Sequence, residues 1–249
     1  MPISDQFTPI HQQSYEIDFF ACSPSGHLKW VDLCKLIQSV SADHSVLGGI
    51  SFWDLKIHNQ AWVLSKFRIE KKADELPQWQ DKITISTWIE RLDGVRSIRN
   101  FEVYFGEQLL AVASSLWVII NTKRRRPECI ALPHEHFIKY TDKKVTQTDF
   151  AKLHKGEYRK IDTLRVKLSD LDMVKHVTNI KYLEWCIDAA FDSQEAVDQI
   201  QVIDMHFLKE TRINDTCEVH FLEENHQRHY QICVEGVVHF YCLMELRDA

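Results

Sequence analysis

The stretch Asp170-Leu-Asp-Met-Val-Lys-His-Val-Thr-Asn-Ile-Lys-Tyr-Leu-Glu-Trp185 joins a cluster of polar residues to the start of an apolar repeat. Asp172 lies four positions before His176, and Asn179 follows. From Ile180 onward the apolar residues recur at helical spacing. Polar groups just ahead of a helix can hold an acid/base pair and the free N–H groups of the helix start against one substrate atom. The stretch therefore predicts a helix with a reaction site at its N-terminal end.

The first half of the chain repeats this order of elements. Phe20-Ala-Cys-Ser-Pro-Ser-Gly-His27 precedes an amphipathic repeat from Leu28 to Val40, just as the segment ending at His176 precedes a repeat running to Ala190. Segments rich in β-branched and aromatic residues, separated by turn residues, follow each repeat. The expected strands are Val63–Glu70, Lys82–Glu90, Ser97–Phe105 and Leu109–Ile120, then Ile200–Thr211, Cys217–Leu222, Arg228–Glu235 and Val237–Leu246.

This pattern predicts an α+β fold built from a duplicated unit. The polar segment Lys123–Gly156 carries Pro127 and Pro133 and is interpreted as a linker. We therefore expect one domain over residues 1–140 and a second over residues 141–249.

Composition narrows the class of protein. The chain has 249 residues, 45% hydrophobic and 27% charged, as in an average globular protein. Its apolar runs, such as Leu109–Ala113, are too short to span a bilayer, and Met1–Ile17 resembles neither a secretory signal nor a transit peptide. Seven scattered cysteines without a C-x-x-C pair predict no disulfide framework and no zinc site, which favours a cytoplasmic location. A net charge of -6 argues against broad nucleic-acid binding.

The stretch at residues 170–185 closely resembles the signature of acyl-acyl carrier protein (acyl-ACP) thioesterases, Asp-x-Asn-x-His-Val-Asn-Asn-x-x-Tyr-x-x-Trp. One catalytic position departs from it, because Val174 stands where the family has Asn. Further matching segments are spread from about Tyr15 to Leu246. They are Trp62-Val-Leu-Ser-Lys-Phe-Arg-Ile69, Trp79-Gln-Asp-Lys-Ile-Thr-Ile85, Thr87-Trp88, Arg99-Asn-Phe-Glu102, Ala113-Ser-Ser-Leu-Trp-Val-Ile119 and Lys123-Arg-Arg-Arg-Pro127.

The resemblance implies two tandem hotdog units, each a helix wrapped by a curved antiparallel sheet. It implies hydrolysis of the thioester between a fatty acyl chain and the phosphopantetheine arm of acyl carrier protein, within fatty acid biosynthesis. The acyl chain would lie in the first unit and the catalytic residues in the second. Carried onto this chain, the catalytic positions are Asp172, His176 and Glu210, with Val174 at the substituted position. Neither a metal nor an organic cofactor is expected.

Water attack is the mechanism that these residues favour. The chain has no Gly-x-Ser-x-Gly elbow, and Thr211 occupies the position after Glu210 where family members often carry Cys. We expect Glu210, on the strand after the helix, to act as general base, and His176 to orient the water or relay its proton. Asp172 would fix the histidine tautomer and the turn, while N–H groups near Val177 to Ile180 receive the oxyanion.

Other readings stay open. The chain could act on acyl-CoA, or it could be a non-catalytic acyl-binding protein weakened by Val174. Lys123-Arg-Arg-Arg126 could dock the acidic carrier protein, with Lys71-Lys72, Arg91, Arg96 and Arg99 as equal rivals, or could be a solvated linker face. His27 mirrors His176 but has Ser23 in place of the acid, and is interpreted as structural. A homodimer is left open.

Overall fold

The structure is a computed structural model that describes residues 3–247, so both outer ends of the expected domain ranges lie outside the described residues. The chain forms two compact units. Unit 1 contains the residues up to Ser65 together with Lys72–Gln147, and unit 2 contains Lys66–Lys71 together with the residues from Thr148 onward. The second unit is therefore not a single stretch of sequence.

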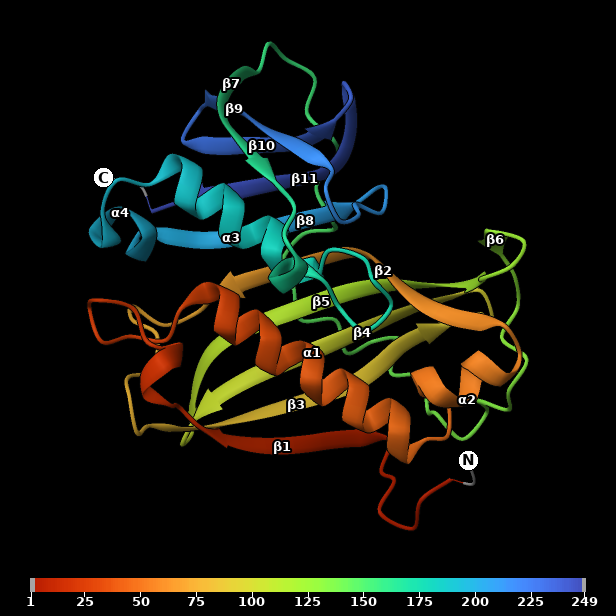
Figure 1. Ribbon diagram of the computed structural model, residues 1–249. Coiled ribbons are helices and arrows are strands. Elements are labelled where there is room, and N and C mark those ends of the chain that lie inside the picture. Colours follow the sequence, from red (N-terminus) through yellow and green to blue (C-terminus); the bar gives the residue numbers. More distant parts are fainter. Residues whose placement is uncertain (1–2, 248–249) are drawn as a thin grey trace. The chain divides into compact units, whose positions relative to one another are not determined.

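Unit 1 is one long helix on an antiparallel sheet. In Figure 1, helix α1 (Trp30–Leu47) lies across the strands, and it contacts β1 and β3. The strand order is β1-β3-β4-β5-β2, with β6 added to β5. The remaining elements are β1 (Ile10–Glu16), α2 (Phe52–Ile57), β2 (Gln60–Lys71, of which the last six residues belong to unit 2), β3 (Lys82–Leu92), β4 (Arg96–Phe105), β5 (Gln108–Asn121) and β6 (Arg126–Pro127).

Helix α1 is longer than the sequence pattern predicted. The apolar repeat was expected to end at Val40, but the inner face of the helix continues with Ser41 and His44, both buried. The helix ends at Gly48, whose N–H donates to the carbonyl of His44 at 3.0 Å. A Cβ atom at Gly48 would overlap the Phe137 ring, so a side chain there would displace that ring. The end of the helix thus depends on close packing as well as on periodicity.

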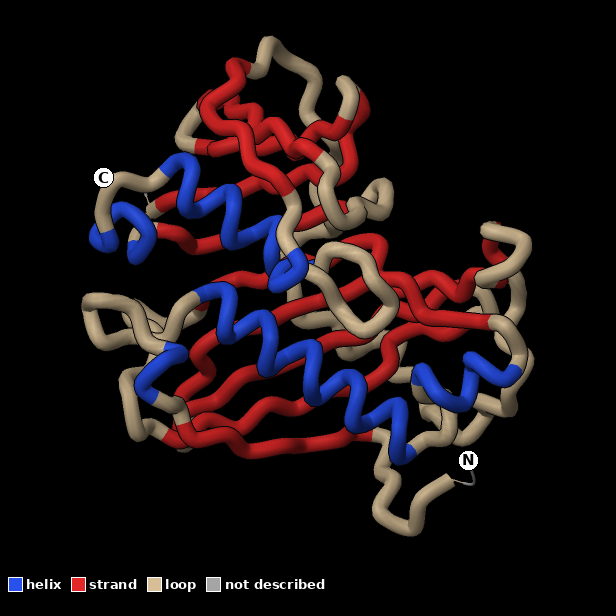
Figure 2. The backbone as a smooth tube through the Cα atoms, viewed as in Figure 1, coloured by secondary structure: helices blue, strands red, loops and turns tan. Residues whose placement is uncertain are grey.

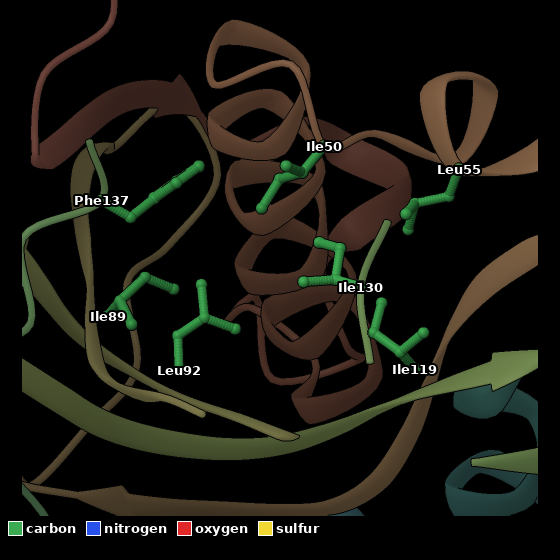
Figure 3. Close-up of a cluster of buried hydrophobic side chains, with 7 residues drawn as sticks. All are labelled: Ile50, Leu55, Ile89, Leu92, Ile119, Ile130 and Phe137. Atoms are coloured by element: carbon green, nitrogen blue, oxygen red, sulfur yellow. The ribbon is translucent and has the colours of Figure 1, made fainter. Parts of the chain in front are cut away.

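The hydrophobic core at this end of unit 1 gathers side chains from helix, sheet and the segment after β6 (Figure 3). The partly buried Phe7, Trp62 and Leu132 pack against it. Its buried members are Ile50, Leu55, Ile89, Leu92, Ile119, Ile130 and Phe137.

A polar network lies buried beside this core. Arg99 on β4 is 3% exposed, and its Nη1 donates to His44 Nδ1 at 2.7 Å and to Thr87 Oγ1 at 3.3 Å. The His44 Nε2–H in turn meets the carbonyl oxygen of Thr8 at 2.9 Å. No carboxylate among the described residues pairs with Arg99, and burial lowers the pKa of Arg99 to about 9. Burial, followed by the charge of Arg99, lowers the pKa of His44 to about 2.

This network predicts that stability falls in mild acid. Because the pKa of His44 is about 2 in the folded state and about 6.5 when unfolded, only the unfolded chain takes up this proton as pH drops below 6.5. The histidine should therefore cost about 1.4 kcal/mol of unfolding free energy per pH unit below that point. Urea denaturation between pH 7.5 and 5 measures the slope. His44→Gln, which keeps an acceptor for Arg99, should flatten it, and the exposed His58→Gln should not; equal slopes in all three proteins would contradict the prediction.

Unit 2 repeats the plan of a helix on an antiparallel sheet. Figure 2 shows helix α3 (Asn179–Ala190) alongside the strands of this unit. The strand order is β2-β8-β11-β10-β9-β7, where β2 contributes only Lys66–Lys71. The other elements are β7 (Arg159–Arg165), α4 (Gln194–Asp198), β8 (Ile200–Phe207), β9 (Thr216–Glu224), β10 (Gln227–Val234) and β11 (Val237–Leu246).

Where β2 pairs with β8, unit 2 encloses charged side chains. Arg68, opposite Asp204 in the register, donates to Glu70 at 2.8 Å and to Asp204 at 3.3 Å. Asp204 is fully buried and also accepts from the Ala151 N–H at 2.9 Å and contacts His206 Nε2 at 3.1 Å. Burial alone would lower the pKa of Arg68, but Glu70 and Asp204 outweigh it and raise the pKa. The second half of β2 is thus tied to unit 2 by ion pairs as well as by sheet hydrogen bonds.

The predicted α+β class, with a helix on an antiparallel sheet in each half, is confirmed. Within the expected linker, β6 is a two-residue strand. One strand was predicted too long: β8 ends at Phe207 and not at Thr211, so Glu210 lies in the irregular segment after the strand. No helix among residues 3–247 is long and apolar enough to cross a membrane.

Candidate active site

The candidate site begins with a tight loop, Leu171–Val177, which is closed by an antiparallel bridge between its two ends. The Asp172 carboxylate accepts from the N–H of Val174 at 2.9 Å and from the N–H of His176 at 3.1 Å. The Asp172 N–H donates to the carbonyl of His176 at 2.8 Å. Lys175 turns the chain with a φ of 66°. These bonds fix the backbone of His176 at the entrance to α3.

The segment that follows the C-terminal end of β8 is hydrogen-bonded to this loop. The Val177 N–H donates to the carbonyl of Thr211 at 3.0 Å, which places the preceding residues, His176 and Glu210, side by side. Thr211 is fully buried, and its hydroxyl lies 2.9 Å from His239 Nδ1. Tyr182 of α3 also bonds Thr211, and burial raises the pKa of Tyr182 to about 12. The position of Glu210 therefore follows from the anchoring of its neighbour.

The two expected catalytic side chains lie next to each other. His176 Nε2 lies 3.3 Å from Glu210 Oε2, and the two side chains are 26% and 25% exposed. Both side chains are therefore partly exposed to water. Arg212, which the sequence had not indicated, places Nη2 3.9 Å from the same Glu210 oxygen.

Two details differ from the expected roles. The Val177 and Thr178 N–H groups are already bonded, to the carbonyls of Thr211 and Asp170 at 3.0 and 2.9 Å, so neither can receive an oxyanion. Among the described residues, the N–H groups of Asn179 and Ile180 have no acceptor in the structure, as in the first turn of any helix. The hydrogen bonds of Asp172 go to backbone N–H groups and not to the imidazole, so Glu210 is the carboxylate next to that ring.

Val174, at the substituted family position, is 42% exposed and gives only its backbone N–H to the loop. Several large apolar side chains close in sequence to His176 or Glu210 are 40% exposed or more, and Val174 is one of them. This set is here called the apolar rim. The members of this apolar rim are Leu168, Met173, Val174, Leu208 and Ile213.

The thiols of unit 2 are poorly suited to nucleophilic attack. Cys217, the cysteine nearest to Glu210 in sequence, is fully buried on β9, and burial raises its pKa to about 12. Cys186 on α3 is also fully buried, and burial raises its pKa further. Because the thiolate is the nucleophilic form, neither cysteine can act near neutral pH.

Comparison with known families assigns both halves of the chain. The model described as acyl-ACP thioesterase N-terminal domain matches residues 9–136, and the model of the C-terminal domain matches residues 153–239. A relative, a chloroplastic palmitoyl-acyl carrier protein thioesterase of Cuphea hookeriana, is 30% identical over 197 residues, covering 72% of this chain and 46% of the relative. The chain thus spans less than half the length of this relative.

Solved structures share the fold over nearly the whole chain. An acyl-ACP thioesterase from Bacteroides thetaiotaomicron superposes with a TM-score of 0.87 at 23% identity, covering 96% of this chain and 98% of that one. The 12:0-ACP thioesterase from Umbellularia californica gives a TM-score of 0.76 at 18% identity, with the same coverage of 96% and 98%. The tandem hotdog fold is therefore the fold of this chain.

Proposed function

Since this chain belongs to the acyl-ACP thioesterase family, we propose that it hydrolyses the thioester between an acyl chain and the phosphopantetheine arm of acyl carrier protein, releasing a fatty acid. The observation that carries the proposal is the 3.3 Å contact between His176 Nε2 and Glu210 Oε2 at a half-open site. A carboxylate and an imidazole at hydrogen-bonding distance can take and pass on the proton of an attacking water.

In the proposed reaction, Glu210 takes a proton from water as the water oxygen bonds to the thioester carbon. His176 orients this water through Nε2 and relays the proton to the departing thiolate. The free N–H groups of Asn179 and Ile180, at the positive end of α3, face the developing oxyanion. Asp172 holds the loop that presents His176, and Arg212 places a positive charge near Glu210.

The proposed partner is an acidic acyl carrier protein, with its acyl chain held in unit 1 as the resemblance implies. Exposed cations adjoin the catalytic pair in sequence, since Lys175 precedes His176, and Lys209 and Arg212 flank Glu210. These three residues, here called the cationic rim, add a candidate to the basic segments named from the sequence. Of those, Arg99 is buried and cannot dock a partner. The proposed location is the cytoplasm, in keeping with the scattered cysteines. Sedimentation velocity tests whether the chain forms a homodimer.

Reversing charge on the cationic rim should weaken use of the carrier protein. We expect Lys175→Glu with Lys209→Glu to raise KM for acyl-ACP about tenfold at low ionic strength, because both charges would then repel the partner. Kinetics at increasing salt measure the effect, which should shrink as the charges are screened. Turnover of a small acyl-N-acetylcysteamine thioester should not change. Lys152→Glu, an exposed site elsewhere in unit 2, is the control; an equal rise in KM there would show that only net charge matters.

The proposed function is tested with a panel of acyl-ACPs and the matching acyl-CoAs, following released thiol and fatty acid. Hydrolysis of acyl-ACP that is lost in His176→Ala supports it. Preference for acyl-CoA, unaffected by competing carrier protein, would instead identify an acyl-CoA thioesterase. The absence of turnover on every member of the panel would contradict both.

A second candidate function rests on Val174. Because Val lacks the side-chain amide of the family position, the site has one polar donor fewer, and the chain could bind acyl-ACP without turning it over. Equilibrium binding of acyl-ACP, measured by anisotropy alongside the hydrolysis assay, separates this acyl-binding function from the enzyme.

A further inference from the structure

Loop Cys22–Leu28 of unit 1 repeats the backbone geometry of loop Leu171–Val177 in unit 2. Each loop is closed by an antiparallel bridge between its first and last residues. Each has a residue of positive φ just before its histidine, Gly26 at 86° and Lys175 at 66°. Three backbone hydrogen bonds of the first loop have equivalents in the second. Ser23 N–H to His27 O corresponds to Asp172 N–H to His176 O (both 2.8 Å), and Leu28 N–H to Pro77 O (2.7 Å) corresponds to Val177 N–H to Thr211 O (3.0 Å). Lys29 N–H to Ala21 O corresponds to Thr178 N–H to Asp170 O (both 2.9 Å).

The side chains around His27 form a constellation that the sequence reading had missed. Its Nε2 lies 3.4 Å from Glu75 Oε2, almost the distance of the His176–Glu210 contact, and 3.1 Å from Gln78 Nε2. On the other side of the ring, Nδ1 lies 3.3 Å from Ser25 Oγ, which contacts Ser23 Oγ at 2.9 Å. His27 was interpreted as structural because Ser23 replaces the acid, but Glu75, on the segment after β2, brings a carboxylate to the ring.

An exposed aromatic surface adjoins this constellation. Phe19 and Phe20, just before the loop, are 65% and 84% exposed, and Trp79, next to Gln78, is 52% exposed. The Phe19 ring packs edge-on against Phe20 at 5.7 Å and against Trp79 at 5.8 Å. A cluster of three exposed aromatic rings is unusual on a protein surface and suits an apolar ligand. Phe19 and Phe20 precede the loop of His27, and Trp79 follows Gln78, so the same two segments carry the aromatic rings and the polar constellation.

We propose that His27, Glu75 and Gln78 form a second hydrolytic site, which cleaves thioesters of apolar acids at the surface of unit 1. The water oxygen bonds to the carbonyl carbon while Glu75 takes its proton and passes it to the adjacent His27 Nε2. The Gln78 amide donates to the carbonyl oxygen, which supplies the side-chain amide that Val174 lacks in unit 2. The carbon–sulfur bond then breaks, and the thiolate receives the proton from His27. The products are a carboxylic acid and a thiol, with no change of oxidation state.

Ser25 is a positioning residue in this site. Its hydroxyl accepts from or donates to Nδ1, so it holds the imidazole with Nε2 toward Glu75 and Gln78. Ser25→Ala should lower kcat for the second site with KM unchanged, and Ser25→Thr should restore it. A merely structural serine would change the thermal midpoint without this separation of kcat from KM.

The decisive experiment removes the unit 2 site first. In full-length protein carrying His176→Ala and Glu210→Ala, hydrolysis of octanoyl-N-acetylcysteamine is followed by thiol release. We expect a residual rate above the buffer rate that falls about tenfold or more when His27→Ala or Glu75→Gln is added. Trp79→Ser should raise KM for this substrate while kcat is kept. His58→Ala and Glu107→Gln, exposed residues of unit 1, are the matched controls and should leave the residual rate unchanged.

The result has two opposite readings. A residual rate that depends on both His27 and Glu75 supports the second site, whether or not acyl-ACP is the natural substrate of unit 2. A residual rate indifferent to both changes, or no rate above buffer, overturns it. Circular dichroism of each variant checks that the protein remains folded, and neither outcome for unit 1 decides whether Glu210 and His176 act in unit 2.

Discussion

Replacement of Glu210 by Gln is expected to lower kcat for acyl-ACP about 10²–10⁴-fold with little change in KM. The amide keeps the size of the carboxylate and can still bond His176, whose Nε2 lies 3.3 Å from the carboxylate oxygen. It cannot accept a proton, so the attacking water loses its base. Steady-state kinetics on acyl-ACP, with released thiol as the signal, measure the loss.

Glu235→Gln is the matched control for this prediction, because Glu235 is an exposed carboxylate of the same unit in the turn between β10 and β11. It should leave kcat within about a factor of two. If Glu210→Gln and Glu235→Gln behave alike, Glu210 is not the base. If instead Glu210→Gln raises KM at constant kcat, the carboxylate serves binding and not proton transfer.

Replacement of Val174 by Asn should raise kcat, with an upper limit of about 10²–10³-fold. Val174 is 42% exposed on the same tight loop as His176, so its side chain can change without repacking a core. A side-chain amide at this position restores a polar donor beside the reaction site. A donor aimed at the developing charge acts mainly on the transition state, so the gain should appear in kcat and not in KM.

Two controls separate the amide from other effects. Val174→Ala removes the branched side chain without adding a donor, and should leave kcat near that of the parent protein. Met173→Asn adds an amide one residue away on the same loop, where it should not serve the carbonyl. Equal gains from Met173→Asn and Val174→Asn would attribute the effect to polarity of the apolar rim. Turnover that appears only in Val174→Asn would identify the parent chain as an acyl-binding protein.

Much of the fold follows from periodicity. Strands β3, β4, β5 and β11 lie close to their predicted bounds because hydrophobic and β-branched residues mark them, and Val237–Leu246 matches its prediction at both ends. The extension of α1 to Leu47 could not be foreseen, since its inner face continues with Ser41 and His44, which are polar but buried. Buried polar residues are accommodated by their hydrogen-bond partners, so an apolar repeat does not reveal them.

The candidate site was only partly visible in the sequence. Asp172 and His176 stand four residues apart, and a loop of that length brings them together locally. Glu210 became a candidate through the family resemblance, and its approach to His176 depends on the Val177–Thr211 hydrogen bond, which no local pattern encodes. Glu75 was missed for the same reason, because it reaches His27 from a segment distant in sequence. The equivalent bonds to Pro77 and Thr211 align Glu210 with Leu76, so Glu75 lies one residue before the position expected from unit 2. Contacts between separate segments are tertiary information, and spacing alone does not supply them.

The ion pairs of Arg68 also determine whether the second unit can fold as a separate fragment. A fragment beginning at Thr148 would keep Asp204 with its Ala151 and His206 contacts but lose Arg68 and Glu70, so the carboxylate would lose its arginine partner. Breaking a buried pair in this way typically costs about 3–5 kcal/mol, comparable with the whole stability of a small domain. The C-terminal repeat should therefore be insoluble when expressed by itself and regain its fold when a synthetic peptide spanning Gln60–Lys71 is added in trans. The second repeat therefore contains a strand encoded within the first half of the chain, so the two repeats are not separable as independent modules.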